Sequence, residues 1–164
     1  MKNLPVDDVQ RVYRFAMRLA RDHHTAEEIV QETFLRAWKG RRRLPNPGAA
    51  RVWLFRIAAN VWRDQLRRGR LPAAQTVPLT DGDPIHTRSP DRIASEQEQV
   101  ERIIHGVDAL PPRQRGVLFL FSIEGLSQGE VARVLGITPE AVKASLSLAR
   151  KALRRRLQRL QAPG

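Results

Sequence analysis

Residues 127–153, SQGEVARVLGITPEAVKASLSLARKAL, have the pattern of two helices joined by a tight turn. Ser127 and Glu130 have the spacing of a capping box, in which a hydroxyl and a carboxylate each accept a hydrogen bond from an otherwise unpaired main-chain N–H. Gly136 is a residue type that ends helices, and Thr138 followed by a proline is typical of a new helix start. The stretch therefore predicts a helix-turn-helix unit.

The second of these helices has one apolar face and one polar, mostly basic face. At about 100° per residue, apolar side chains recur on the face that would be buried, namely Val142, Leu146, Ala149, Leu153 and Leu157. The opposite face carries Glu140, Lys143, Ser147, Arg150, Lys151 and Arg154. In a helix-turn-helix such side chains can reach phosphates and base edges. The alternative is a solvated basic helix that packs only on its own domain.

The composition also points to a polyanionic partner. A net charge of +12 and a pI near 11.5 favour nucleic acid over a membrane surface, because no isolated amphipathic anchor stands out. The absence of cysteine excludes disulfides and thiolate zinc sites. With neither a signal peptide nor a long apolar run, we expect a soluble, cytoplasmic protein.

The chain is predicted to be all-α, with two small helical domains. Residues 71–90 contain four prolines and a turn-forming Asp-Gly-Asp, so we expect an extended, mobile linker there. Residues 1–70 would form a three- to four-helix domain and residues 91–164 the helix-turn-helix domain. Each is near the lower size limit for independent stability, so docking on a partner could order their relative placement.

The amino-terminal block has a patterned pair of helices. Residues 9–19 have helical spacing, and the next helix is predicted to begin at Thr25, which has capping-box spacing to Glu28. One face of that helix carries Glu28, Gln31, Glu32 and Leu35. A leucine among carboxylates and an amide is either an ordinary scattered surface residue or part of a surface that docks a partner.

A basic loop and a third helix follow. Residues 39–47 are predicted to be a loop with Arg41, Arg42 and Arg43 in a row, which is usually just solvated, and Asn46 would cap a helix over about residues 48–68. The polar face of that helix carries Trp53, Arg56, Asn60, Arg63, Asp64 and Arg67. A tryptophan among arginines suits base stacking beside phosphate pairing. The alternative is that Trp53 packs under a neighbouring loop.

Three segments resemble bacterial RNA polymerase sigma factors of the extracytoplasmic-function type, which are group 4 of the sigma-70 family. Residues 26–38, AEEIVQETFLRAW, resemble the core-binding helix of that family. Residues 52–60, VWLFRIAAN, with Asp64 and Arg67-Arg68 after them, resemble its promoter-melting helix. Residues 110–153 resemble the carboxy-terminal domain that reads the upstream promoter element.

The resemblance implies a division of labour in transcription initiation. Docking on the clamp helices of the largest polymerase subunit would fall to Glu28, Gln31, Glu32 and Leu35. The non-template strand of the −10 element, with one base out of the stack, would be held by Arg41, Arg42, Arg43, Trp53, Arg56, Asn60, Arg63 and Arg67. The −35 element would be bound by Lys143, Ser147, Arg150, Lys151 and Arg154. The resemblance also implies an anti-sigma factor as a further partner, and a linker that threads toward the polymerase active-site and RNA-exit region.

The recognition helix departs from the family at two positions. Ser145 and Leu148 stand where the family often has arginine. If each arginine would have contacted a phosphate, its loss lowers the slope of the salt dependence by about one unit.

Two other classes of protein fit the sequence less well. A free-standing helix-turn-helix regulator that binds an operator as a dimer is the alternative, but nothing resembles a ligand domain and the basic face of the first block would have no role. An enzyme is not expected, because no Walker loop, H-E-x-x-H motif, nucleophile–base pair or metal cluster occurs. We therefore expect no catalytic residue, cofactor or metal.

Overall fold

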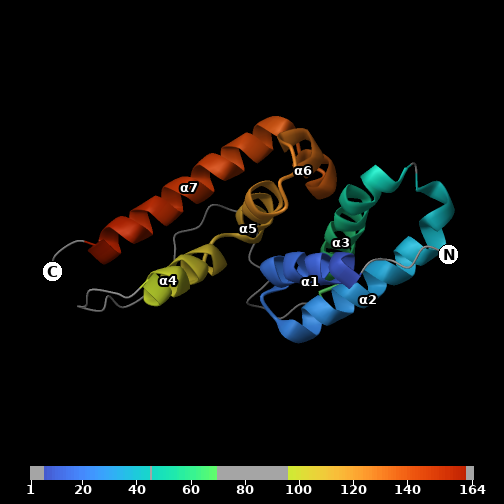
Figure 1. Cartoon of the computed structure of the whole chain (residues 1–164), viewed down its shortest axis with the longest axis horizontal. Helices are drawn as coiled ribbons and strands as arrows, with labels where there is room; N and C mark the ends of the chain where they lie inside the picture. Colours follow the sequence, from blue (N-terminus) through green and yellow to red (C-terminus); the bar gives the residue numbers. More distant parts are fainter. Residues whose placement is uncertain (1–5, 45, 70–95, 162–164) are drawn as a thin grey trace.

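A computed structural model describes residues 6–44, 46–69 and 96–161, and every regular element in these ranges is helical (Figure 1). This confirms the all-α fold class. The segment predicted to be the linker, residues 71–90, lies outside the described residues.

The first half of the chain is a three-helix unit. It consists of α1 (Val6–Ala20), α2 (His23–Gly40) and α3 (Ala50–Arg67), which pack against one another. Phe15 of α1 meets Phe55 of α3 edge to face, with ring centroids 5.3 Å apart, and both side chains are fully buried. Buried aliphatic side chains from all three helices complete this core, among them Leu19, Ile29, Leu54 and Val61.

The start of α2 differs from the prediction. The capping residue is Asp22, whose carboxylate accepts hydrogen bonds from the main-chain N–H of Thr25 at 2.8 Å and from its hydroxyl at 2.6 Å. Thr25 lies inside the helix and is buried, so the predicted Thr25–Glu28 capping box is wrong. The reason is the turn before it: Arg21 adopts a left-handed conformation (φ 56°), which ends α1 and leaves Asp22 extended at the cap position.

The segment predicted to be a loop is partly helical. α2 continues to Gly40, and the three arginines form the 3-10 turn η1 (Arg41–Arg43). The side-chain oxygen of Asn46 accepts a hydrogen bond from the N–H of Ala49 at 2.8 Å, which caps the short turn η2 (Pro47–Ala49) at the entry of α3. Asn46 therefore caps the turn that leads into α3 and not α3 itself, which begins after Ala49 with no side-chain cap.

The second half contains the helix-turn-helix. Its elements are α4 (Glu96–Asp108), α5 (Pro112–Leu118), the π-helical turn η4 (Phe119–Ile123), α6 (Gln128–Leu135) and α7 (Pro139–Gln161). Both halves of the Ser127–Glu130 capping box are present. Gly136 is left-handed (φ 65°), and the hydroxyl of Thr138 accepts from the N–H of Ala141. The predicted helix-turn-helix is confirmed at each of these positions.

The two halves pack against each other (Figure 1). Buried side chains from both halves form one core. α1 contacts α5, and α3 contacts α6. The rings of Phe15 and Phe119 stack with centroids 6.1 Å apart across this boundary. At Gly116 of α5 the approach is so close that a Cβ atom would lie 3.2 Å from a methyl carbon of Leu19. Nothing in the spacing of the sequence predicted this contact.

Candidate nucleic-acid interface

The polar face of α2 presents an apolar side chain to solvent. Leu35 is 47% exposed, and Glu28 and Gln31 on the same face are exposed as well. Glu32 is half-buried because its carboxylate binds Nε of Arg36 at 2.7 Å, one helical turn away. The structure therefore brings these four residues together on one side of α2, with Glu32 already engaged within the protein.

An ion-pair chain continues from this face to α3. Arg36 also donates from Nη1 to Asp64 of α3 at 2.9 Å, and Asp64 binds Arg67 on its other oxygen. The hydrogen bond from Arg36 lowers the pKa of the Asp64 carboxyl; partial burial opposes this shift, and the bond from Arg67 adds to it. The carboxylate of Asp64 thus holds two arginines from two helices.

The end of α2 carries an exposed aromatic ring that the sequence analysis did not select. Trp38 is 41% exposed, and the guanidinium of Arg41 lies 4.0 Å from its ring centroid. Arg41 also donates from Nη1 to the main-chain oxygen of Trp38 at 2.6 Å. The other two arginines of η1 are exposed. The sequence signal was available, since Trp38 follows Leu35 by three residues and so shares its helix face.

The predicted strand-opening face of α3 is only partly free. Arg56, Asn60 and Arg67 are exposed. Trp53 is half-buried: it packs on the core, and a Cβ at Gly40 would lie 3.3 Å from its ring. This is the geometry expected if Trp53 is a packing residue, while base stacking by Trp53 stays a prediction.

Arg63 is turned toward the helix-turn-helix. Its Nη2 donates to the main-chain oxygen of Val134 in α6 at 3.2 Å, and burial lowers the pKa of its guanidinium. A groove of about 500 Å³ lies beside it, lined by Arg36, Asn60, Arg63, Asp64, Leu66 and Arg67. In this arrangement Arg63 is not available to a nucleic acid in the way that Arg56 is.

The predicted DNA face of α7 is continuous and exposed. All five selected residues, Lys143, Ser147, Arg150, Lys151 and Arg154, are exposed and line one groove of about 400 Å³ together with Gln128 and Leu146. The guanidinium of Arg150 lies 5.9 Å from the ring centroid of Phe121. Of the two departures from the family, Leu148 is 40% exposed but Ser145 is 6% exposed, so only Leu148 stands on the outer surface.

The described part of the chain has no candidate metal-ligand cluster and no candidate membrane-spanning helix. Within residues 6–44, 46–69 and 96–161, no three histidine or acidic side chains gather as metal ligands would. In the same part of the chain, no helix has both the length and the apolar character that crossing a bilayer requires.

Comparison with protein families gives two matches in chain order. Residues 7–71 match the family described as Sigma-70 region 2, and residues 101–153 match Sigma-70, region 4. The first match begins at the second residue of α1 and extends past the end of α3, and the second begins within α4 and extends into α7.

Curated relatives match over most of the chain. The ECF RNA polymerase sigma factor SigL of Mycobacterium tuberculosis is 34% identical over 91% of this chain and 84% of its own length. SigE of Mycolicibacterium smegmatis is 34% identical over 88% of this chain, and the chain spans 56% of that protein. The probable sigma factor RfaY of Xanthomonas campestris is 34% identical, and the chain spans 37% of it.

Solved structures agree in fold. The sigma factor RpoE of Bartonella quintana, solved with the anti-sigma factor NepR, is similar with a TM-score of 0.69 at 23% identity, covering 93% of each chain. CnrH, solved with the cytosolic domain of CnrY, has a TM-score of 0.59 at 26% identity and covers 91% of this chain and 81% of its own.

Proposed function

The chain belongs to the extracytoplasmic-function sigma factors of the sigma-70 family, and from this premise we propose that it binds core RNA polymerase, directs it to specific promoters and helps to open the −10 element. The observation that carries the proposal is that three candidate faces follow one another along the chain in the order that this function needs, with the first and third exposed and the second partly engaged by contacts within the protein. They are the Leu35 face of α2, the basic turn with α3, and the outer face of α7.

The α2 face is assigned to the polymerase. Leu35 is a large apolar side chain left in water beside the carboxylate of Glu28 and the amide of Gln31. An apolar anchor inside a polar rim is the usual composition of a protein–protein contact, and it is a poor surface for DNA because carboxylates repel phosphates. Glu28, Gln31, Glu32 and Leu35 would dock on the clamp helices of the largest polymerase subunit.

The −10 element is assigned to the other end of the same unit. Cations in the turn η1 and along α3 supply phosphate contacts, and an aromatic ring supplies a stacking surface for an unpaired base. The residues proposed for this role are Arg41, Arg42, Arg43, Trp53, Arg56, Asn60, Arg63 and Arg67. Such binding traps the opened strand and needs no hydrolysis, so we assign the protein no catalytic residue.

The −35 element is assigned to α7. A helix-turn-helix places the first turns of its second helix nearest the base edges, so Lys143 and Ser147 would read sequence. Arg150, Lys151 and Arg154 lie further along and would bind phosphates. An anti-sigma factor that covers the polymerase-binding face is proposed as a further partner, in line with the complexes in which RpoE and CnrH were solved. Since its proposed partner is RNA polymerase, we place the protein in the cytoplasm.

Transcription in vitro with core polymerase and a promoter library tests the proposal. We expect the protein to start transcription from a defined subset of promoters with two sequence blocks, and core polymerase alone to start none of them. Specific DNA binding without any polymerase-dependent transcription would instead support the alternative of a free-standing operator-binding regulator.

A further inference from the structure

A large apolar side chain stands exposed on α7 among cations. Leu148 is 40% exposed, and its neighbours one helical turn before and after it are Ala144 and Lys151, which are exposed as well. A single leucine on a protein surface is ordinary, but this one lies on the helix that the proposed function places in a DNA groove. Its direction on that helix decides whether DNA can cover it.

The burial pattern of α7 fixes the direction that points away from the protein. The buried side chains of this helix are those of Val142, Ser145, Leu146 and Ala149. At about 100° per residue, the direction opposite their mean falls between Glu140 and Lys151, and both of these side chains are exposed. This outward direction is the one that a helix-turn-helix aims into the major groove.

Leu148 lies within the arc of α7 that can reach base edges. It is rotated by about 70° from the outward direction, and Lys143, a proposed reader of sequence, is rotated by about 70° to the other side. Along the helix axis Leu148 lies only about 1.5 Å beyond Ser147, the other proposed reader. The five residues selected from the sequence are centred about 45° to the Lys143 side of the outward direction, and for this reason they leave Leu148 out.

The charges around Leu148 favour a polyanion as the partner that covers it. Lys151 lies one turn further along α7, Arg154 and Arg155 lie one turn beyond that, and all three side chains are exposed. These cations attract the phosphate backbone, whereas a protein surface that buried Leu148 would have to remove water from them. The partner that fits this part of α7 is therefore duplex DNA, with its major groove over the helix.

A leucine in the major groove discriminates between base pairs by its lack of polar atoms. The apolar group that base edges present in that groove is the C5-methyl group of thymine. Packed over a G·C pair, leucine would take water from the acceptors of guanine and replace none of their hydrogen bonds. Leu148 therefore favours a pair that contains thymine, whereas arginine, which the family often has at this position, most commonly reads guanine.

We propose that Leu148 is a specificity-determining residue, which selects an A·T pair in the −35 element by packing on the methyl group of its thymine. The small side chain of Ala144, one turn before it, leaves room for that methyl group to approach. The inference rests on the proposed function, because it requires that α7 reads promoter DNA. It goes beyond that function by naming one base pair of the element and the side chain that reads it.

Removal of single methyl groups from the promoter tests the inference. Wild-type holoenzyme first selects its −35 element from duplex promoters that are randomised in that region. Each thymine of the selected element is then replaced by uracil, which lacks only the methyl group. At one position uracil should weaken binding of the wild-type holoenzyme by about fourfold, the factor that corresponds to one buried methyl group. With Leu148→Ala the same replacement should have almost no effect.

Leu157→Ala is the matched control. Leu157 is 37% exposed and lies on the same helix, but it is nine residues beyond Leu148 and turned toward the core side of α7. This variant loses the same side chain and any packing that a surface leucine contributes. It should keep the full effect of uracil at the position that Leu148 reads.

A substitution to arginine gives an independent measurement. Leu148→Arg supplies the donors that guanine accepts, so selection from the same randomised promoters should change from A·T to G·C at that one position, by about tenfold. The preferences at the other positions should stay as in the wild type. A variant that selects the same element as the wild type would overturn the inference.

The remaining outcomes separate this inference from the proposed function. If no thymine of the selected element responds to uracil, or if the response is as large in Leu148→Ala as in the wild type, Leu148 does not read a methyl group. An equal loss on every promoter with Leu148→Ala would mean that polymerase covers this side chain, and would overturn the inference as well. A wild-type holoenzyme that selects no −35 sequence would instead contradict the proposed function.

Discussion

Arg36 of α2 and Asp64 of α3 are joined by a hydrogen bond of 2.9 Å, and this bond connects the two faces of the first helical unit. On one side Arg36 holds Glu32 of the proposed polymerase face, and on the other Asp64 holds Arg67 of the proposed −10 face. The four side chains alternate in charge, and their contacts fix the proposed polymerase face of α2 relative to the proposed −10 face of α3. A substitution in the middle of the chain is expected to disturb both.

The first prediction concerns the acid sensitivity that Asp64 confers. Its pKa is lowered in the folded protein, so the stabilisation is fully present above the unfolded pKa of about 4 and is lost as pH falls through the folded value. Asp64→Asn should lower the free energy of unfolding at pH 7 by about 1 kcal/mol, with a difference from wild type that shrinks as the pH falls below the unfolded pKa of about 4. Urea unfolding between pH 3 and 7 measures this. Glu101→Gln, an exposed carboxylate in α4, is the control and should show no such convergence.

The second prediction separates a docking leucine from a core residue on the same helix. Leu35→Glu should change stability by about 0.5 kcal/mol or less, because the side chain is half in water, but should weaken binding to core polymerase. Gln31→Ala should act in the same direction. The matched variant Ile29→Glu puts a carboxylate at a position that is 0% exposed, and should unfold the unit.

Circular dichroism and a core-binding assay on the same preparations decide between the two roles. A Leu35→Glu protein that unfolds like Ile29→Glu, or that is folded and binds polymerase normally, contradicts the assignment of the α2 face.

How far the sequence predicts this molecule depends on whether the relevant signal is local. The helix-turn-helix was predictable to the residue, since Ser127, Gly136 and Thr138 each act on main-chain groups within four positions of themselves. The start of α2 was not, because Thr25 has the right spacing to be a cap, and only the left-handed turn at Arg21 gives that role to Asp22.

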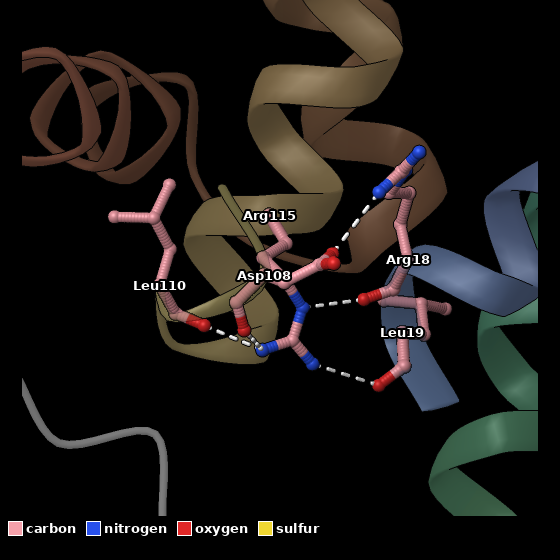
Figure 2. Close-up of polar contacts among 5 residues, drawn as sticks. All are labelled: Arg18, Leu19, Asp108, Leu110 and Arg115. Carbon is pink, nitrogen blue, oxygen red and sulfur yellow. Dashed lines mark hydrogen bonds and ion pairs between the residues drawn. The ribbon is translucent and has the colours of Figure 1, made fainter. Parts of the chain in front are cut away.

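The contact between the two halves could not be predicted from local sequence patterns. Arg115 looks like an ordinary surface residue in the string PPRQRG, but it donates to the main-chain oxygens of Arg18 and Leu19 in α1 (Figure 2), which are nearly a hundred residues away and carry no side-chain signal. In the same way the basic face of α3 was predictable from periodicity, but that Arg63 faces Val134 and Trp53 faces Gly40 depends on neighbours that periodicity does not identify.

The third prediction divides the α7 face by distance from its start. Lys143→Ala or Ser147→Ala should relax sequence preference at one base pair of the −35 element by about 1 to 3 kcal/mol. Lys151→Ala should weaken all sequences alike and lower the salt-dependence slope by about one unit. Lys151 is preferred to Arg150 for this test, because removal of Arg150 also removes its contact with Phe121. Binding of the holoenzyme to single-base promoter variants at several salt concentrations measures both effects. Uniform losses from all substitutions would contradict the division.

The last prediction concerns strand opening by Trp53. A base stacked on one aromatic ring is worth about 1 to 3 kcal/mol, so Trp53→Ala should lower open-complex formation on a fully paired promoter by about tenfold or more. A template with a pre-melted bubble should recover transcription, since it no longer requires the trapped base. The half-buried Trp53 ring also lies against Gly40 and on the core. If its role is packing, Trp53→Ala should lower stability and reduce every activity together, with no recovery on the bubble template.

Trp62, on the same helix and 6% exposed, supplies the comparison for that packing role. Trp62→Ala should lower stability by about 3 to 5 kcal/mol and reduce every activity together, with no recovery on the bubble. Trp38→Ala, at the exposed ring beneath Arg41, should leave the melting temperature nearly unchanged and shows whether the stacking surface lies there instead. Melting temperature, promoter affinity and the bubble-to-duplex ratio of transcription are measured on all three. Suppose that Trp53→Ala behaves like Trp62→Ala while transcription by Trp38→Ala is rescued by the bubble. Trp53 is then a packing residue at the end of α2, and the unpaired base of the −10 element stacks on Trp38.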